Sequence, residues 1–254
     1  MKHAFLFSSG IGILVLALLF FFSREKSQSP LPNAMDAITY QKVNFLTQDG
    51  VTIAGNYYLA KDSRAAVLFL HMKPATKESW DTLARALQGK GISSLAIDLR
   101  GHGESIKQKE TVLDYRNFSY EERQKYEFDV EAALEWLRKE GFSPPSIRLA
   151  GASIGANLTL QALARHPEIK RGAALSPGNY QGEVKPLAEK LHPDQMVFYA
   201  TSQDDGTNTK KVEELYQATP AKKELKVYEN AGHGTTMLEK TDDLFGLVVR
   251  FLMQ

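Results

Sequence analysis

The stretch Gly151-Ala-Ser-Ile-Gly155 decides how this chain is interpreted. It follows Ile147 to Ala150, which predicts a strand, and it precedes Ala156 to Arg165, which predicts a helix. A serine between two glycines at such a junction is typical of a sharp strand-to-helix turn. The turn would hold the hydroxyl at a helix N-terminus, where backbone N–H groups favour developing negative charge. Ser153 is therefore a candidate nucleophile, and the alternative is a glycine-rich loop that only connects two elements.

Strand and helix patterns alternate on both sides of this turn. Val43 to Leu59 predicts two strands around an Asp49-Gly50 turn. The further predicted strands are Ala65 to Leu70, Ser93 to Leu99, Ala173 to Leu175, Met196 to Thr201 and Leu225 to Tyr228. The further predicted helices are Ser79 to Gln88, Glu121 to Lys139, Thr209 to Gln217 and Asp243 to Leu252. This alternation predicts an α/β fold in which helices cover both faces of a mainly parallel sheet, opened by an antiparallel hairpin.

A serine nucleophile needs a general base, and the base needs an acid that orients it. His233 is the predicted base, because it follows a strand, lies downstream of Ser153 and is flanked by Gly232 and Gly234. His71 and His102 precede the serine and are expected to make structural hydrogen bonds. The remaining histidines are assigned to the N-terminal segment, to a helix end and to the surface: His3, His166 and His192.

The acid and the oxyanion hole are less sharply determined by the residues alone. Asp204 and Asp205 both follow the strand Met196 to Thr201, and either could orient the imidazole. The backbone N–H of Ile154 is one expected oxyanion donor, and the loop after Leu70 supplies the second. Because Pro74 has no N–H, that second donor is Met72 or Lys73.

Taken together, these motifs resemble those of the α/β-hydrolase superfamily, in particular its small serine esterases and dienelactone-hydrolase-like members. The resemblance covers the chain after a short linker. It rests on the opening hairpin, the His71 loop, Asp98-Leu-Arg-Gly-His-Gly-Glu-Ser105, Gly151 to Gly155, Ser202 to Asp205, and Gly232 to Gly234.

The resemblance implies an α/β-hydrolase fold with a mostly parallel, eight-stranded sheet and little or no cap domain. It also implies Asp205 as the acid, since family members carry Gly or Ser three residues before it. Lys73 is implied as the oxyanion donor, because the family has His-Gly-x in this loop, although Met72 replaces the usual glycine. The segments Ser176 to Gln195 and Ile106 to Tyr120 are the stretches that could cover the site.

Composition excludes several function classes. The chain has no cysteine, which rules out disulfides, thiolate metal sites and a cysteine nucleophile. Its formal net charge of +1 gives no basic footprint for phosphate backbones, so nucleic acid is not an expected partner. No metal or organic cofactor is implied.

The N-terminus differs in character from the rest of the chain. Residues 4–22 carry no charge and, as a helix, would reach roughly 28 Å, close to the thickness of a bilayer core. We predict a membrane anchor or signal segment over 1–26, a linker over 27–37 and the hydrolase domain over 38–254. An uncleaved signal anchor is favoured over a removed signal peptide or a core helix. The catalytic domain is expected outside the cytoplasm, periplasmic or extracellular.

These features together predict a serine hydrolase that cleaves carboxylic esters or thioesters through an acyl-enzyme. The expected partners are a small-molecule ester or acyl substrate and, through the N-terminal helix, a membrane. A serine peptidase with the same triad is one alternative. A catalytically silent, membrane-tethered binding module is the other.

Overall fold

The computed structural model describes residues 40–178 and 184–254. The strands in this part of the chain are β1 (Gln41–Leu46), β2 (Val51–Tyr58), β3 (Ala66–Leu70), β4 (Ser93–Ile97), β5 (Lys107–Gln108), β6 (Thr111–Val112), β7 (Ile147–Ala152), β8 (Arg171–Leu175), β9 (Met196–Ser202) and β10 (Lys222–Tyr228). The helices are α1 (Asp81–Gln88), α2 (Tyr120–Gln124), α3 (Tyr126–Lys139), α4 (Ile154–Arg165), α5 (Lys185–Ala188), α6 (Asn208–Ala218), α7 (Met237–Lys240) and α8 (Leu244–Met253).

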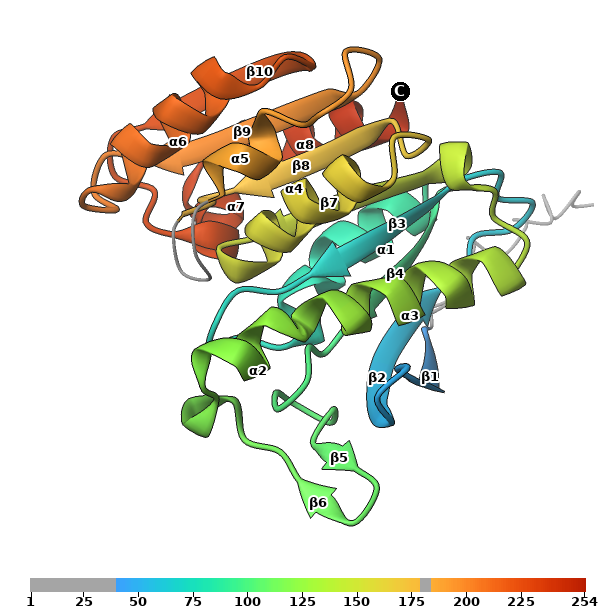
Figure 1. The fold of residues 1–254 in the computed structure, drawn as a ribbon. Helices are drawn as coiled ribbons and strands as arrows, with labels where there is room; N and C mark the ends of the chain where they lie inside the picture. The colour runs from blue at the N-terminus through green and yellow to red at the C-terminus, as the bar shows by residue number, and fades with distance from the viewer. Residues whose placement is uncertain (1–39, 179–183) are drawn as a thin grey trace, which may run out of the picture. The chain divides into compact units, whose positions relative to one another are not determined.

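These strands form one sheet with the order β10-β9-β8-β7-β3-β4-β2-β5-β6, and β1 pairs with β2 (Figure 1). Every pairing from β10 to β4 is parallel, and the pairings of β2 with β4, β1 and β5 are antiparallel. The parallel strands therefore end at one common edge of the sheet. In open α/β sheets, ligands bind in the crevice at this carboxyl edge.

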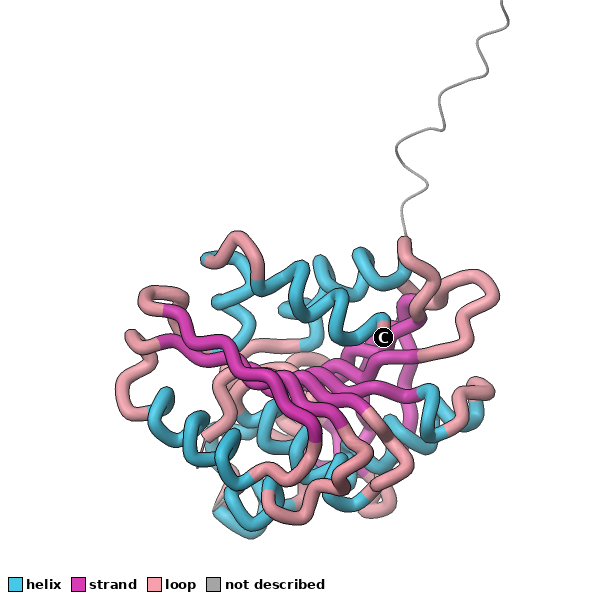
Figure 2. The backbone as a smooth tube through the Cα atoms, turned by 90° about the horizontal axis from the view of Figure 1, so that it is seen from above, coloured by secondary structure: helices cyan, strands magenta, loops and turns pink. Residues whose placement is uncertain are grey.

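Helices cover both faces of the sheet (Figure 2). Alternate residues of β3 divide between two buried clusters: Leu68 belongs to the cluster that includes residues of α3, α4 and α6, whereas Phe69 belongs to the cluster that includes residues of α1 and α8. All five residues of β3 are buried, as expected for a central parallel strand. Each face thus has its own apolar core, and both cores hold the strand ends in place.

The predicted fold is confirmed, with two differences of detail. The sheet has ten strands in the described part of the chain, two more than predicted, because β5 and β6 form an extra hairpin of two-residue strands beside β2. Such short strands leave no periodic signal in a sequence. The predicted helix Glu121 to Lys139 is split into α2 and α3 at Lys125. No separate cap appears between β8 and β9 among the described residues, where α5 is four residues long.

The predicted transmembrane signal anchor requires a correction. Among residues 40–178 and 184–254, no helix is long and apolar enough to cross a membrane. The 14 residues of α3 would rise about 21 Å, whereas a bilayer core is about 30 Å thick. The predicted segment 4–22 lies outside the described residues, so the membrane as a partner has no structural support. Residues Ile38–Gln254 form one compact unit, and the predicted boundaries at 26 and 37 stay a prediction.

Candidate active site

The turn between β7 and α4 consists of Ser153 alone. Its backbone has φ 53° and ψ −115°, a conformation that a residue with a side chain rarely adopts and that costs roughly 1–3 kcal/mol. The Ser153 N–H donates to the Leu175 carbonyl at the end of β8, at 2.8 Å. The Ser153 side chain is partly exposed and stands at the N-terminus of the 12-residue α4.

The two glycines around Ser153 are required by close packing. A Cβ on Gly151 would lie 2.0 Å from the Gly155 carbonyl oxygen. A Cβ on Gly155 would lie 2.1 Å from the Leu70 carbonyl oxygen and 2.8 Å from that of His71. These separations are far below the 3.5–4.0 Å of ordinary nonbonded contacts. The turn is therefore closed tightly upon itself, and it packs directly against the loop that follows β3.

His233 and Asp205 form a hydrogen-bonded pair at the same edge of the sheet. The distance from His233 Nδ1 to Asp205 Oδ2 is 2.6 Å, and the side chains are 38% and 15% exposed, respectively. Because an ionised carboxylate can only accept, Nδ1 carries the proton and Nε2 is left as the basic nitrogen. Asn208, at the start of α6, donates its Nδ2 to the same Asp205 oxygen at 3.0 Å.

The neighbouring carboxylate, Asp204, has a different role. Its Oδ1 and Oδ2 accept the Gly232 N–H at 3.0 and 3.1 Å, and Oδ1 also accepts the Ser202 hydroxyl. These hydrogen bonds, from Ser202 first and then from Gly232, lower the pKa of Asp204. Asp204 thus holds the loop that carries His233, whereas Asp205 contacts the imidazole itself.

Gly234 brings the histidine loop against the serine turn. A Cβ on Gly234 would lie 3.4 Å from the Ala152 Cβ and 2.6 Å from Met72 Sδ. The residue after His233 therefore packs against the residue before Ser153. The Gly234 N–H donates to the buried Ser176 hydroxyl at 3.0 Å. Ser176 was not predicted from the sequence, because it lacks the two flanking glycines that singled out Ser153.

The loop after β3 is shaped by His71, which is fully buried. Its Nε2 accepts the Leu99 N–H at 3.0 Å, so Nδ1 carries the proton and donates to the Met72 carbonyl at 2.9 Å. Burial lowers the pKa of His71 to about 4, which keeps this ring neutral. In a trans peptide the C=O and N–H groups point in opposite directions. The Lys73 N–H is therefore directed away from the His71 ring.

Other residues singled out by their motifs have structural surroundings. His102 is buried, stacks on Tyr115 with ring centroids 3.8 Å apart, and its pKa is lowered to about 4 by burial and by His71. His166 contacts Glu131 through Nε2 at 2.9 Å. His192 is exposed, with a side-chain exposure of 51%.

The Asp98 to Ser105 motif forms buried ion pairs. Asp98 accepts the Lys77 ammonium at 2.7 Å, and Arg100 contacts Asp129 at 2.8 Å and Asp49 at 2.7 Å. The Arg100 contact fastens the opening hairpin turn to the end of β4 and to α3. The motif therefore supports the strand ends, and it brings no side chain to the His233–Asp205 pair.

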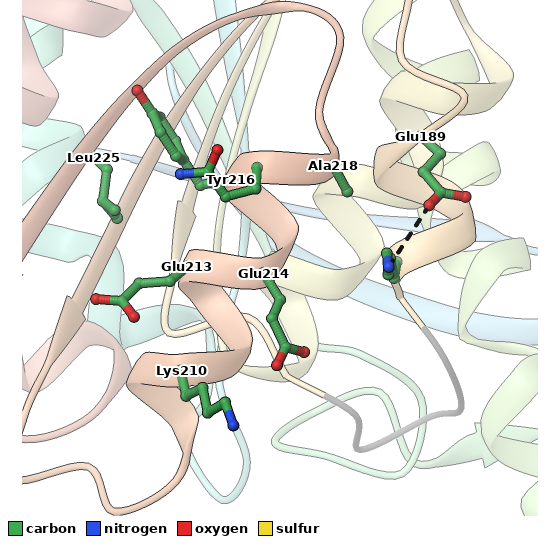
Figure 3. A pocket seen from close by; sticks show the side chains of 9 residues that line it. Glu189, Lys210, Glu213, Glu214, Tyr216, Ala218 and Leu225 are labelled. Atoms are coloured by element: carbon green, nitrogen blue, oxygen red, sulfur yellow. Dashed lines mark ion pairs between the residues drawn. The ribbon is translucent and has the colours of Figure 1, made fainter.

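A surface cavity lies away from these residues. It has a volume of about 730 Å³ and is lined by residues of α5, α6 and β10 (Figure 3). None of Ser153, Asp205 and His233 lines it. The cavity and the candidate catalytic residues thus lie in different places, and the strained serine with the nearby histidine–carboxylate pair is the stronger indication of a site. Within residues 40–178 and 184–254, no group of three or more His, Asp or Glu side chains could hold a metal ion.

Comparison with known proteins gives a family match. A family model described as alpha/beta hydrolase fold matches residues 65–233, which is more than half of the chain. Thiohydrolase aneE of Aspergillus aculeatus is 34% identical over 119 residues, covering 45% of this chain and 34% of that protein. The chain spans from about a third to about half the length of the curated relatives it matches.

Solved structures share the fold at lower identity. Esterase Pf2001 of Pyrococcus furiosus matches with a TM-score of 0.69 and 21% identity, over 85% of this chain and 92% of that chain. A dienelactone hydrolase of Anabaena variabilis matches with a TM-score of 0.64 and 17% identity, over 85% and 98%. At these identities the likeness extends to the fold alone.

Proposed function

Because the chain belongs to the alpha/beta hydrolase fold family, we propose that it is a serine hydrolase that cleaves carboxylic esters or thioesters. One observation carries the proposal. The loop with the His233–Asp205 hydrogen bond packs against the residue preceding Ser153, which is itself held in a strained turn. Strained backbone of this kind concentrates at functional sites.

The proposed reaction has two halves. Ser153 Oγ attacks the acyl carbon while His233 Nε2 takes its proton, and the imidazolium then protonates the departing alcohol or thiol. Water attacks the resulting acyl-enzyme by the same route, with His233 again as base. Asp205 keeps the proton on Nδ1 and stabilises the imidazolium, and Asn208 and Asp204 hold the acid and the loop in place.

Two backbone N–H groups are proposed to bind the oxyanion. Ile154 lies in the first turn of α4, where N–H groups have no partner within the helix. The Lys73 N–H points away from His71 because the Met72 carbonyl accepts that ring's proton. This favours Lys73 over Met72 as the second donor. Met72 instead packs its sulfur against Gly234.

The names of similar proteins are compatible with this substrate class. One curated relative is a thiohydrolase, and the structural neighbours include an esterase. Oxygen and sulfur esters share the acyl half of the reaction and differ only in the leaving group. The same triad would serve a peptidase, whose leaving group is a poorer amine.

A matched substrate series tests the proposal. The full chain would be assayed with one short acyl group attached in turn as an ester, a thioester and an anilide. We expect turnover of the ester or thioester, little of the anilide, and loss of turnover in Ser153→Ala and His233→Gln. Preferential turnover of the anilide would favour the peptidase. A folded protein inactive towards all three would favour the silent binding module.

A further inference from the structure

Among the strands that the structure describes, β10 is the last of the sheet, and none of them lies on its outer side. In the described part of the chain, β10 pairs with β9 alone. Lys222, Glu224 and Lys226 are exposed, and Val227 is 39% exposed. An edge of this kind presents its outer N–H and C=O groups as a template for another strand.

The surface next to this edge has the character of an interface rim. The 730 Å³ cavity reaches β10 at Leu225, which Figure 3 shows to one side of the α6 side chains. Its charged lining includes both signs, with Lys210 near Glu213 and Glu214. A polar rim of mixed charge suits a surface that meets a copy of itself, because each sign can find its opposite across a two-fold axis.

A two-fold axis perpendicular to the sheet would place a second β10 antiparallel to the first. Directly opposite residues of antiparallel strands have their side chains on the same face of the sheet. One residue of β10 must therefore lie directly opposite its own copy, with the axis midway between the two. Only three such registers pair at least five of the residues in Lys222–Tyr228. They are centred on Glu224, on Leu225 and on Lys226.

The charges of β10 distinguish these three registers. Centring on Glu224 puts that carboxylate opposite its own copy and Lys222 opposite Lys226. Centring on Lys226 puts two ammonium groups opposite each other. Centring on Leu225 pairs the full strand, places Glu224 opposite Lys226 twice, and puts no like charges face to face. Opposite charges in directly facing positions stabilise a strand pair, and like charges destabilise it.

We propose that β10 pairs with β10 of a second copy of this chain, antiparallel and centred on Leu225. The two sheets then continue into one another across the axis. The lysines that would discourage indiscriminate pairing of an edge strand leave this single register open. Lys226 is 3.9 Å from Asp243 at its nearest, an exposed contact that leaves it able to face a second carboxylate.

A single cysteine tests the register, because the chain contains none of its own. Leu225→Cys places two thiols directly opposite each other, within the Cα separation of 4.4–6.8 Å that a disulfide allows. Val227→Cys is the matched control, since four residue positions, about 13 Å, then separate the two thiols. Under mild oxidation of the full chain, we expect a covalent dimer from Leu225→Cys and about a tenfold slower crosslink from Val227→Cys.

Charge reversal tests the pairing itself. In the Leu225→Cys background, Glu224→Lys or Lys226→Glu creates two like-charge pairs, and we expect crosslinking to fall by about tenfold. The double variant Glu224→Lys/Lys226→Glu restores both pairs and should restore crosslinking. Circular dichroism would establish that each variant is folded, and sedimentation would measure the dimer without any cysteine.

The crosslinking and sedimentation results either support or overturn the pairing of β10 with its copy. Fast crosslinking at position 225, slowed by either single reversal and rescued by the double, supports the proposal. Equal crosslinking at 225 and 227, indifference to the charge reversals, or a monomer by sedimentation at about 100 µM would overturn it. Hydrolytic activity plays no part in these measurements, so they stand apart from the proposed reaction.

Discussion

Two glycine-containing loops follow β7 and β4, the strands on either side of β3, and they differ in how they hold their polar side chains. The Gly151–Gly155 turn holds a partly exposed serine on a strained backbone, and its hydroxyl is the proposed nucleophile. The Asp98–Ser105 loop buries the charges of Asp98 and Arg100 and pairs them with Lys77 and Asp129, respectively. Two loops with similar glycine signals in the sequence thus differ in structure: one holds a strained, partly exposed serine, and the other holds buried ion pairs.

The same contrast divides the histidines. His71 and His102 are buried, and burial lowers the pKa of each to about 4. His233 is 38% exposed and is hydrogen-bonded to Asp205 through one nitrogen. Residue type alone does not identify a base. A base needs an accessible nitrogen and a partner that fixes where its proton resides.

The largest expected effect concerns the serine turn. Ser153→Ala should lower kcat by roughly 10⁴-fold or more, because the nucleophile is removed while the fold remains. Esterase kinetics would measure this loss, and circular dichroism would establish that the variant is folded. Retention of more than a tenth of the activity would place the nucleophile elsewhere.

The second largest effect concerns the two adjacent carboxylates, whose substitution should lower kcat to different extents. Asp205→Asn should reduce kcat by roughly 10³-fold, since an amide can no longer fix the imidazole tautomer. Asp204→Asn keeps a carbonyl acceptor for the Gly232 N–H, so we expect a loss of only a few-fold. The comparison is made with the same ester under identical conditions. Equal losses would contradict the separate roles of the two carboxylates.

Substitutions at the buried ion pair of Asp98 should lower the stability of the fold and leave kcat unchanged. Lys77→Met leaves buried Asp98 without its ammonium partner, and unfolding should become easier by about 3 kcal/mol. Urea denaturation measures this, with Glu78→Gln as the exposed control expected to change stability by less than about 1 kcal/mol. The kcat per folded molecule of Lys77→Met should stay near that of the wild type. A specific loss of kcat would give Lys77 a part in the chemistry.

Acid should weaken the loops that follow β3 and β4 through their buried histidines, His71 and His102, respectively. His71 and His102 bind protons near pH 6.5 when unfolded but only near pH 4 when folded. The unfolded state therefore takes up more protons between these values, and stability falls as the pH drops from 6.5 towards 4. From pH 7 to pH 5 the loss is roughly 2 kcal/mol for each histidine. His102→Phe keeps an aromatic ring against Tyr115, and it should flatten the dependence measured by urea denaturation. An unchanged slope would contradict this account.

The smallest effect tests the strain in the serine turn. Ser153→Gly should be more stable than Ser153→Ala by about 1 kcal/mol, because only glycine adopts a positive φ without strain. Both variants lack the hydroxyl, so the difference isolates the backbone. Equal melting temperatures would show that the turn is not strained.

Much of this architecture follows from local patterns. The strands buried on both faces and the Asp49-Gly50 turn are visible in the sequence, because they depend on apolar runs and on residues suited to turns. The β5–β6 hairpin is too short to leave such a pattern. The break at Lys125 is marked by no proline or glycine, so the sequence gives no signal of it.

The candidate site divides in the same way. Ser153 and His233 carry glycine signals of their own, so their positions could be predicted. The distinction between Asp204 and Asp205 depends on which carboxylate faces a loop 28 residues further along the chain. Ser176, which holds the Gly234 N–H, is identified only by a contact between distant segments. The membrane anchor was predicted from 4–22 alone, and the described residues contain no helix of that kind.

The most direct measurement is labelling of the full chain with a fluorophosphonate, followed by intact mass and peptide mapping. We expect one adduct per chain on the peptide containing Ser153, absent in Ser153→Ala and formed much more slowly in His233→Gln. A folded protein that takes no label, or that takes it on another serine, would contradict the assignment of the nucleophile and with it the proposed hydrolase.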